Sequence, residues 1–195
     1  MRRILLLTCL AVAGCGADPV LFAAPPAISV ASPVGDPGPR VPVAYRTVEI
    51  REVSLPTYAE SETIFMEGGG GTLMPAQGVE WADLPQRAIT LDLAEVLEGV
   101  TGALVAAEPW PFEALPQARV EVRVTRLAAG VDGVFRIGGH YYVADLRGEL
   151  DRPSDRSGQF EASVPYDPEG GAAAIAMARS RAVRDLARQI ASRAM

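Results

Sequence analysis

Residues 119–124, Arg-Val-Glu-Val-Arg-Val, alternate charged and apolar side chains without a break. Because successive side chains of a β-strand point to opposite faces of a sheet, this alternation predicts a strand with one buried and one solvated face. Val120, Val122 and Val124 form the apolar side, so we expect them in the core.

Two more strands are predicted after it. Gly130 to Gly133 is typical of a turn, after which Val134 to Leu150 returns as a long strand. Residues 160, 162 and 164 are again apolar and alternate with polar ones, which predicts a third strand. Three consecutive strands between Val120 and Pro165 indicate an antiparallel meander.

The pair Gly138-Gly139 predicts a β-bulge within the second of these strands. Beyond the bulge we expect Tyr142, Ala144 and Leu146 to face the core. Tyr141 and Val143 would then project to the opposite face of the sheet, which would not be purely polar.

Two helices are predicted. The first starts at Asp83, which can cap it, and runs to about Val100, with Pro85 in the first turn and Gln86 placed to complete a capping box. The second, alanine-rich, runs from Glu169 to Arg193. Both have apolar residues at three- and four-residue spacing, which gives each one face that can be buried. These residues are Ile89, Leu93, Val96, Leu97 and Val100 in the first helix, and Ile175, Val183, Leu186 and Ile190 in the second.

Three strands are expected before the first helix, at Val43 to Val53, Glu62 to Glu67 and Thr72 to Met74. Gly68, Gly69, Gly70 and Gly71 lie between the last two, as a flexible hairpin loop. The predicted order is β-β-β-α-β-β-β-α. It indicates a single α+β domain over residues 43–195, with a mainly antiparallel sheet and both helices packed on one face.

The N-terminus carries an export signal. Arg2 and Arg3 precede a short apolar run, and residues 12–15, Val-Ala-Gly-Cys, match the bacterial lipobox. Ten apolar residues rise only about half the ~30 Å of a bilayer core, so this segment is too short for a transmembrane helix. We expect cleavage after residue 14 and acylation of Cys15. Gly16 in place of aspartate favours the outer membrane, with the domain on its periplasmic side.

Residues 15–42 are rich in proline, which predicts a semi-extended tether between the lipidated Cys15 and the domain. Cys9 leaves with the signal peptide, so no disulfide can form within the mature chain. The net charge is −6, without an obvious basic cluster outside the last helix, so nucleic acid is not an expected partner.

No catalytic or metal-binding constellation is predicted. His140 is the only histidine and no mature cysteine is free. The chain therefore has too few of these residues for a histidine-assisted nucleophile or for a typical zinc site. Gly68 to Gly71 lacks the lysine and helix context of a phosphate-binding loop. Asp151 and Asp155 fall in a polar loop that we interpret as a solvated turn rather than a calcium site. We therefore expect no enzyme, no metal and no cofactor beyond the lipid on Cys15.

Several short motifs in order behind the lipobox resemble the ABC-type transport auxiliary lipoprotein family, which includes the outer-membrane lipoprotein of the paraquat-inducible (Pqi) system. They are residues 53–58 (Val-Ser-Leu-Pro-Thr-Tyr), residues 81–85 (Trp-Ala-Asp-Leu-Pro), Arg119 to Leu127, the turn Gly130 to Gly133, the strand through Tyr142, and the closing helix. The Gly68 to Gly71 run departs from the family, which usually has a charged or polar turn there. Proline also comes one position late after Trp81-Ala82.

This resemblance implies a non-catalytic component of a lipid transport system. Its partners would be an inner-membrane ABC transporter and a mammalian-cell-entry (MCE) protein whose tunnel crosses the periplasm. The lipoprotein would dock that tunnel at the outer membrane, as a homo-oligomer. The alternative is an envelope-assembly or scaffold lipoprotein that binds proteins but no transporter. In either case Gly68 to Gly71 and Trp81 are the expected partner contacts, Trp81 because a loop meets a helix there.

Overall fold

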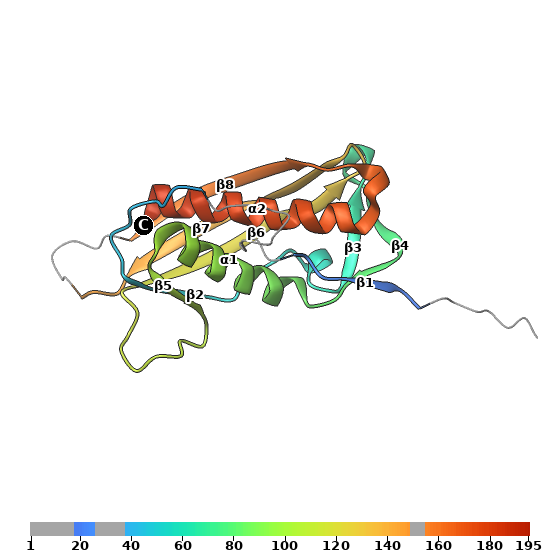
Figure 1. Ribbon diagram of the computed structural model, residues 1–195. Coiled ribbons are helices and arrows are strands. Elements are labelled where there is room, and N and C mark those ends of the chain that lie inside the picture. Colours follow the sequence, from blue (N-terminus) through green and yellow to red (C-terminus); the bar gives the residue numbers. More distant parts are fainter. Residues whose placement is uncertain (1–17, 26–37, 149–154) are drawn as a thin grey trace, which may run out of the picture.

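The structure is a computed structural model that describes residues 18–25, 38–148 and 155–195. Within them, eight strands form one mixed sheet and two long helices cover one of its faces (Figure 1). The strands are β1 (Val20–Phe22), β2 (Thr47–Ile50), β3 (Thr63–Glu67), β4 (Leu73–Trp81), β5 (Leu104–Ala107), β6 (Ala118–Gly130), β7 (Val134–Asp145) and β8 (Arg156–Pro165); the helices are α1 (Pro85–Thr101) and α2 (Gly171–Ala194). The predicted α+β class, with a single domain, is confirmed.

The strand that contains residues 119–124 is β6, and it is the centre of the sheet. One edge of β6 pairs antiparallel with β7, which pairs in turn with β8, so the predicted meander is present. The other edge pairs in parallel with β2 near the start of β6 and with β3 near its end. Val120 and Val122 have no exposed surface, as the alternation predicted.

The remaining strands make the sheet more mixed than expected. β5 pairs in parallel with β2, and β1 pairs in parallel with β4, whereas β3 and β4 form an antiparallel hairpin. Neither β1 nor β5 was predicted, and β4 is longer than Thr72 to Met74. The three antiparallel ladders join β3 to β4, β6 to β7 and β7 to β8, and the last two of these are the longest in the sheet.

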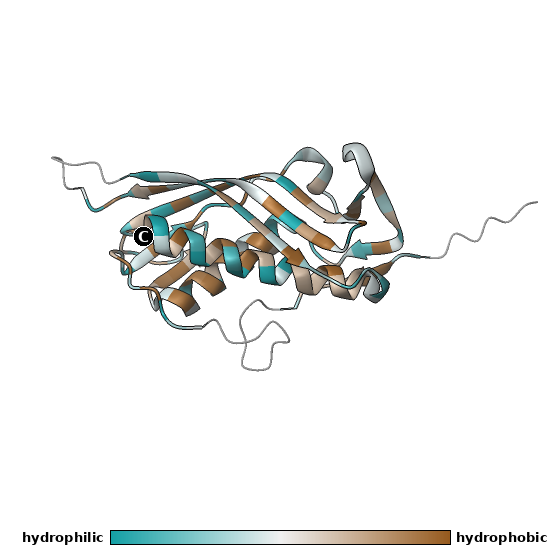
Figure 2. Cartoon of the chain, turned by 90° about the horizontal axis from the view of Figure 1, so that it is seen from above, coloured by the Kyte–Doolittle hydropathy of each residue, from teal (hydrophilic) through white to brown (hydrophobic). Residues whose placement is uncertain are grey.

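The core lies between the helices and the sheet. Leu93 and Leu97 of α1 and Leu186 and Ile190 of α2 have no exposed surface, which agrees with their predicted apolar faces. Figure 2 shows the apolar residues of both helices beneath the sheet. The capping box is absent, because α1 starts after Leu84 and the Asp83 carboxylate instead accepts the N–H of Leu84, at 2.9 Å.

The predicted inward set of β7 is wrong. Tyr141 and Val143 are buried, whereas Tyr142 is 39% exposed. The pairing explains the difference, because the irregularity lies between Val124 and Arg126 on β6 and the alternation of β7 continues unbroken. The solvated face consequently carries Tyr142 in place of the expected Tyr141 and Val143.

Both described parts of the expected tether lie against the domain. β1 is hydrogen-bonded to β4, and the N–H of Ala82 donates to the carbonyl of Phe22 at 2.9 Å. Near the end of the segment, the N–H of Val41 donates to the carbonyl of Val100 at 2.7 Å. These parts are therefore held by the fold. The signal peptide and Cys15 lie outside the described residues, as does Asp151.

Gly139 shows why glycine is needed opposite the irregularity in β6. A Cβ atom there would collide with the carbonyl oxygen of Arg123 and lie 2.9 Å from the Cα of Val124. At Gly138 the nearest atom to a Cβ would be the Phe160 carbonyl oxygen, at 3.5 Å, which is an ordinary contact. A Cβ atom thus fits at position 138 but not at position 139.

We expect Gly139→Ala to lower the free energy of unfolding by about 1–3 kcal/mol, because backbone atoms of β6 must move. Gly138→Ala is the matched control and should change stability by less than about 0.5 kcal/mol. Urea unfolding of the two variants measures the difference. Equal stability of the two would contradict the close approach of β6 and β7.

Candidate binding surfaces

The structure separates the two predicted partner contacts. Gly69–Gly71 form a kinked turn at the tip of the β3–β4 hairpin, with Gly70 at a φ of 70°, and are exposed. Trp81 is the last residue of β4, so the whole length of this nine-residue strand lies between them. Trp81 is only 6% exposed and belongs to the core. Partner binding by the glycine tip stays a prediction, and Trp81 does not lie on the same surface.

Trp81 lies beneath a buried charge. The Arg179 guanidinium of α2 is 4.6 Å from the centre of the Trp81 ring, and Arg179 is 3% exposed. Its Nη2 lies 3.6 Å from Oδ2 of Asp92 on α1, which makes an ion pair between the two helices. Among the described residues, neither Arg179 Nε nor Asp92 Oδ2 has a hydrogen-bond partner. This pair joins α1, α2 and β4 in a low-dielectric region.

Burial dominates the electrostatics of the pair. It raises the pKa of Asp92 to about 6, although the Arg179 charge opposes the shift, and Glu95 adds to it. Burial also lowers the pKa of Arg179. Removing two charges from water thus costs more than their attraction at this distance recovers, as is common for buried ion pairs.

Because the folded-state pKa of Asp92 is above its usual 3.8, the folded protein holds the proton more tightly than the unfolded chain. The contribution of Asp92 to the free energy of unfolding is therefore most favourable below pH 4. It falls, by ~3 kcal/mol at most, as the pH rises to above 6. Asp92→Asn cannot ionise, so its stability relative to wild type should rise over this window. Urea midpoints at pH 4, 5, 6 and 7 measure the change, and a constant difference would contradict it.

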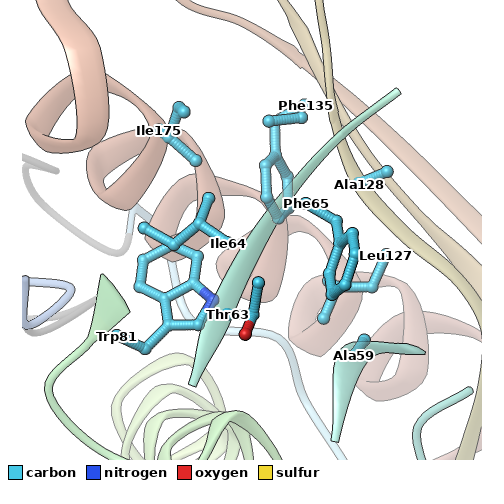
Figure 3. A pocket seen from close by; sticks show the side chains of 10 residues that line it. Ala59, Thr63, Ile64, Phe65, Trp81, Leu127, Ala128, Phe135 and Ile175 are labelled. Carbon is cyan, nitrogen blue, oxygen red and sulfur yellow. The ribbon is translucent and has the colours of Figure 1, made fainter. Parts of the chain in front are cut away.

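The small cavity on the other side of Trp81 is a packing feature. Figure 3 shows Trp81, Ile64 and Ile175 around it, and its volume is ≈ 20 Å³. This is about the space of one water molecule. Its lining is almost entirely apolar, so it offers no binding site for a larger ligand.

His140 lies on the solvated face of the sheet, at a hollow of ≈ 260 Å³. Its Nε2 is 3.3 Å from Nε2 of Gln159 on β8. The two arginines at the hollow are neutralised by neighbours, Arg126 by Glu67 at 2.7 Å and Arg136 by Asp132 at 2.5 Å. The Asp132 pKa is lowered, first by its hydrogen bond from Arg136. Within the described ranges, no three histidine, cysteine or acidic residues are grouped so as to hold a metal ion.

The β5–β6 loop (residues 108–117) is a surface that was not expected from the sequence, and it projects from the body of the domain (Figure 1). Leu115 is 84% and Phe112 44% exposed. The loop is nevertheless fixed: Trp110 Nε1 donates to the carbonyl of Ala114 at 2.7 Å, and its ring meets that of Phe112 edge-on at 5.0 Å. At its base, the Glu108 carboxylate accepts the N–H of Glu52 at 2.8 Å. Alternation of proline with aromatic residues at 109–112 was the available signal.

Comparison with known proteins identifies the family of this chain. The ABC-type transport auxiliary lipoprotein component family matches residues 28–191. The chain belongs to this family. The resemblance drawn from the motifs is thereby confirmed, and with it a lipoprotein class associated with ABC transport.

Solved structures support the fold. A crystal structure of an uncharacterized protein matches 78% of this chain and 94% of its own, with a TM-score of 0.63 and 17% identity. A protein of Xanthomonas campestris, assigned to the DUF330 family, matches 90% and 91%, with a TM-score of 0.60 and 17% identity. At these identities the likeness concerns the fold alone. Comparison with curated proteins gives no match. No helix in the described part of the chain is long and apolar enough to span a membrane.

Proposed function

We propose that this family member is a non-catalytic, lipid-anchored component of an ABC/MCE-type lipid transport system that docks the periplasm-spanning transporter at the outer membrane. The family match over residues 28–191 carries the proposal, since the family is named for its association with ABC transport. The lipobox ending at Cys15 supports anchoring on the periplasmic side.

The surfaces of the domain favour protein docking over chemistry. His140 has Gln159 as its side-chain neighbour, and the nearby arginines are held in ion pairs, so no nucleophile and base are brought together there. The β5–β6 loop instead presents apolar side chains on a preorganised backbone. Rigid, exposed aromatic and aliphatic anchors of this kind dominate the affinity of many protein interfaces.

We assign partner binding to the β5–β6 loop in the first place. The glycine tip at residues 68–71 is the second candidate, since it is exposed and free of side chains that would limit its adaptation to a neighbour. A homo-oligomer built through either surface belongs to the same proposal. The competing function, an envelope scaffold that binds proteins without a transporter, uses the same surfaces and differs in the partner.

Lipid attachment is tested by Cys15→Ser. This thiol is the acyl acceptor of the lipobox, so the variant should lose palmitate labelling and appear as a soluble or uncleaved periplasmic form. Metabolic labelling with palmitate followed by membrane fractionation measures both. Label and membrane localisation that persist in Cys15→Ser would contradict the anchor.

Partner binding is tested with the mature protein and an MCE-domain protein from the same organism. The wild type should bind at micromolar concentration or self-associate in light scattering. Phe112→Ser with Leu115→Ser should weaken binding about tenfold or more, as expected for exposed anchor residues. Leu73→Ser with Met74→Ser, also exposed, changes the second candidate surface beside the glycine tip and should leave binding unchanged if the β5–β6 loop is the contact.

Loss of binding only in the Leu73 and Met74 variant would move the contact to the hairpin tip. A strictly monomeric wild type that fails to bind the MCE protein would reject the transport role and favour the scaffold alternative.

A further inference from the structure

The docked N-terminal segment leaves little chain between the domain and the membrane. β1 is held by β4, and Ser180 Oγ on α2 donates to the carbonyl of Pro25 at 2.7 Å. Val20, the first residue of β1, lies five positions after Cys15. Five residues reach at most ~17 Å when fully extended. A lipid on Cys15 would therefore keep β1 close to the bilayer surface.

Four apolar side chains are exposed around β1, beside the charged Asp18 and the Asp83–Arg87 ion pair. Val20 is 58% and Leu21 60% exposed, and Leu84 and Leu91 at the start of α1 are also exposed. We call these four residues the β1 patch; Val20 and Leu21 point to opposite faces of the edge strand β1, so the patch wraps around that edge. Leu84 and Leu91 are seven positions apart, so they lie on the same side of the helix. A hollow of ≈ 190 Å³, lined by Phe22, Leu91 and their neighbours, joins β1 to this side of α1.

Charge along α1 distinguishes its two ends. Arg87 lies between Leu84 and Leu91 and is paired with Asp83. One to two turns beyond Leu91, Glu95 and Glu98 are exposed. Carboxylates resist entry into the low-dielectric boundary of a lipid layer, whereas leucines favour it. The first half of α1 is thus suited to a lipid surface and the second half is not.

The β5–β6 loop is at the other end of the molecule. It leads into the start of β6, whereas the end of β6 pairs with β3, next to β4 and β1. The 13 residues of β6 span about 40 Å. Figure 1 shows β1 and this loop at opposite ends of the long axis.

We propose that the β1 patch contacts the bilayer surface, so that the domain stands on its β1 end and turns the β5–β6 loop away from the membrane. This inference rests on the lipid anchor of the proposed function. The short connection between Cys15 and β1 keeps the patch at a high local concentration of lipid, so a patch of only four side chains suffices for contact. A protein that bound the β1 patch instead would have to fit into the space of at most ~17 Å between β1 and the bilayer.

The test uses the mature acylated protein, which lacks Cys9, in phosphatidylcholine vesicles. Leu91→Cys and Leu115→Cys make the same change at two exposed leucines, and each is labelled with bimane, since the acylated Cys15 does not react. A lipid with a doxyl group near the headgroup quenches bimane at short range. We expect quenching at position 91 to exceed that at position 115 about threefold or more. The reason is that the chain between Cys15 and Val20 spans at most ~17 Å, which keeps the β1 end near the lipid.

A second variant tests the patch itself. Leu21→Ser with Leu84→Ser, added to Leu91→Cys, should reduce quenching toward the level at position 115, with the melting temperature as the control for folding. Unchanged quenching, or equal quenching at 91 and 115 in vesicle-bound protein, overturns the orientation and leaves the anchor intact. Protein that does not float with the vesicles rejects the anchor, and the orientation with it.

Discussion

The structure depends on the pairing of both edges of β6. One edge carries β7 along almost its entire length, and the other carries β2 and β3 one after the other. The irregularity between Val124 and Arg126 lies between the segments of β6 that pair with these two strands. Glycine opposite this point lets the two backbones approach without a side chain between them. The pairing along β6 thereby places the β3–β4 hairpin at one end of the domain and the β2–β5 pair at the other.

The Arg179–Asp92 pair illustrates a different constraint. Charges buried at this cost contribute little to stability, and hydrophobic replacements of similar volume are often neutral or stabilising. What the pair does fix is geometry: one side chain from each helix and the Trp81 ring at the end of β4 meet at a single point. Helix-to-helix register and the position of β4 are thus linked, and the docking site of the N-terminal segment lies directly beside them.

Periodicity predicted the parts of the fold in which side-chain burial follows the local pattern. The valines of β6 and the apolar faces of α1 and α2 are in the core because each element is long enough to express its period. β1 and β5 have three and four residues, too few for a pattern, and β1 lies among prolines. The inward set of β7 was wrong because the irregularity was assigned to the strand with the glycines instead of its partner. Nothing local distinguishes these two cases. Long-range contacts such as Arg179 with Asp92, and the exposure of Leu115, depend on tertiary structure that no local pattern encodes.

The shortness of β1 has a consequence for molecules crowded on one membrane. An open sheet edge is a template on which a neighbouring chain can add a strand, and confinement to a surface raises the frequency of such encounters. Here the β4 edge is covered by the chain's own N-terminal segment. Pro19 directly precedes β1, and Pro25 follows three residues after its end. Proline has no N–H to donate, so the new outer edge is only three residues long and cannot be extended in register. The same segment that leads to the anchor thereby shields this edge of the sheet from pairing with a neighbouring chain.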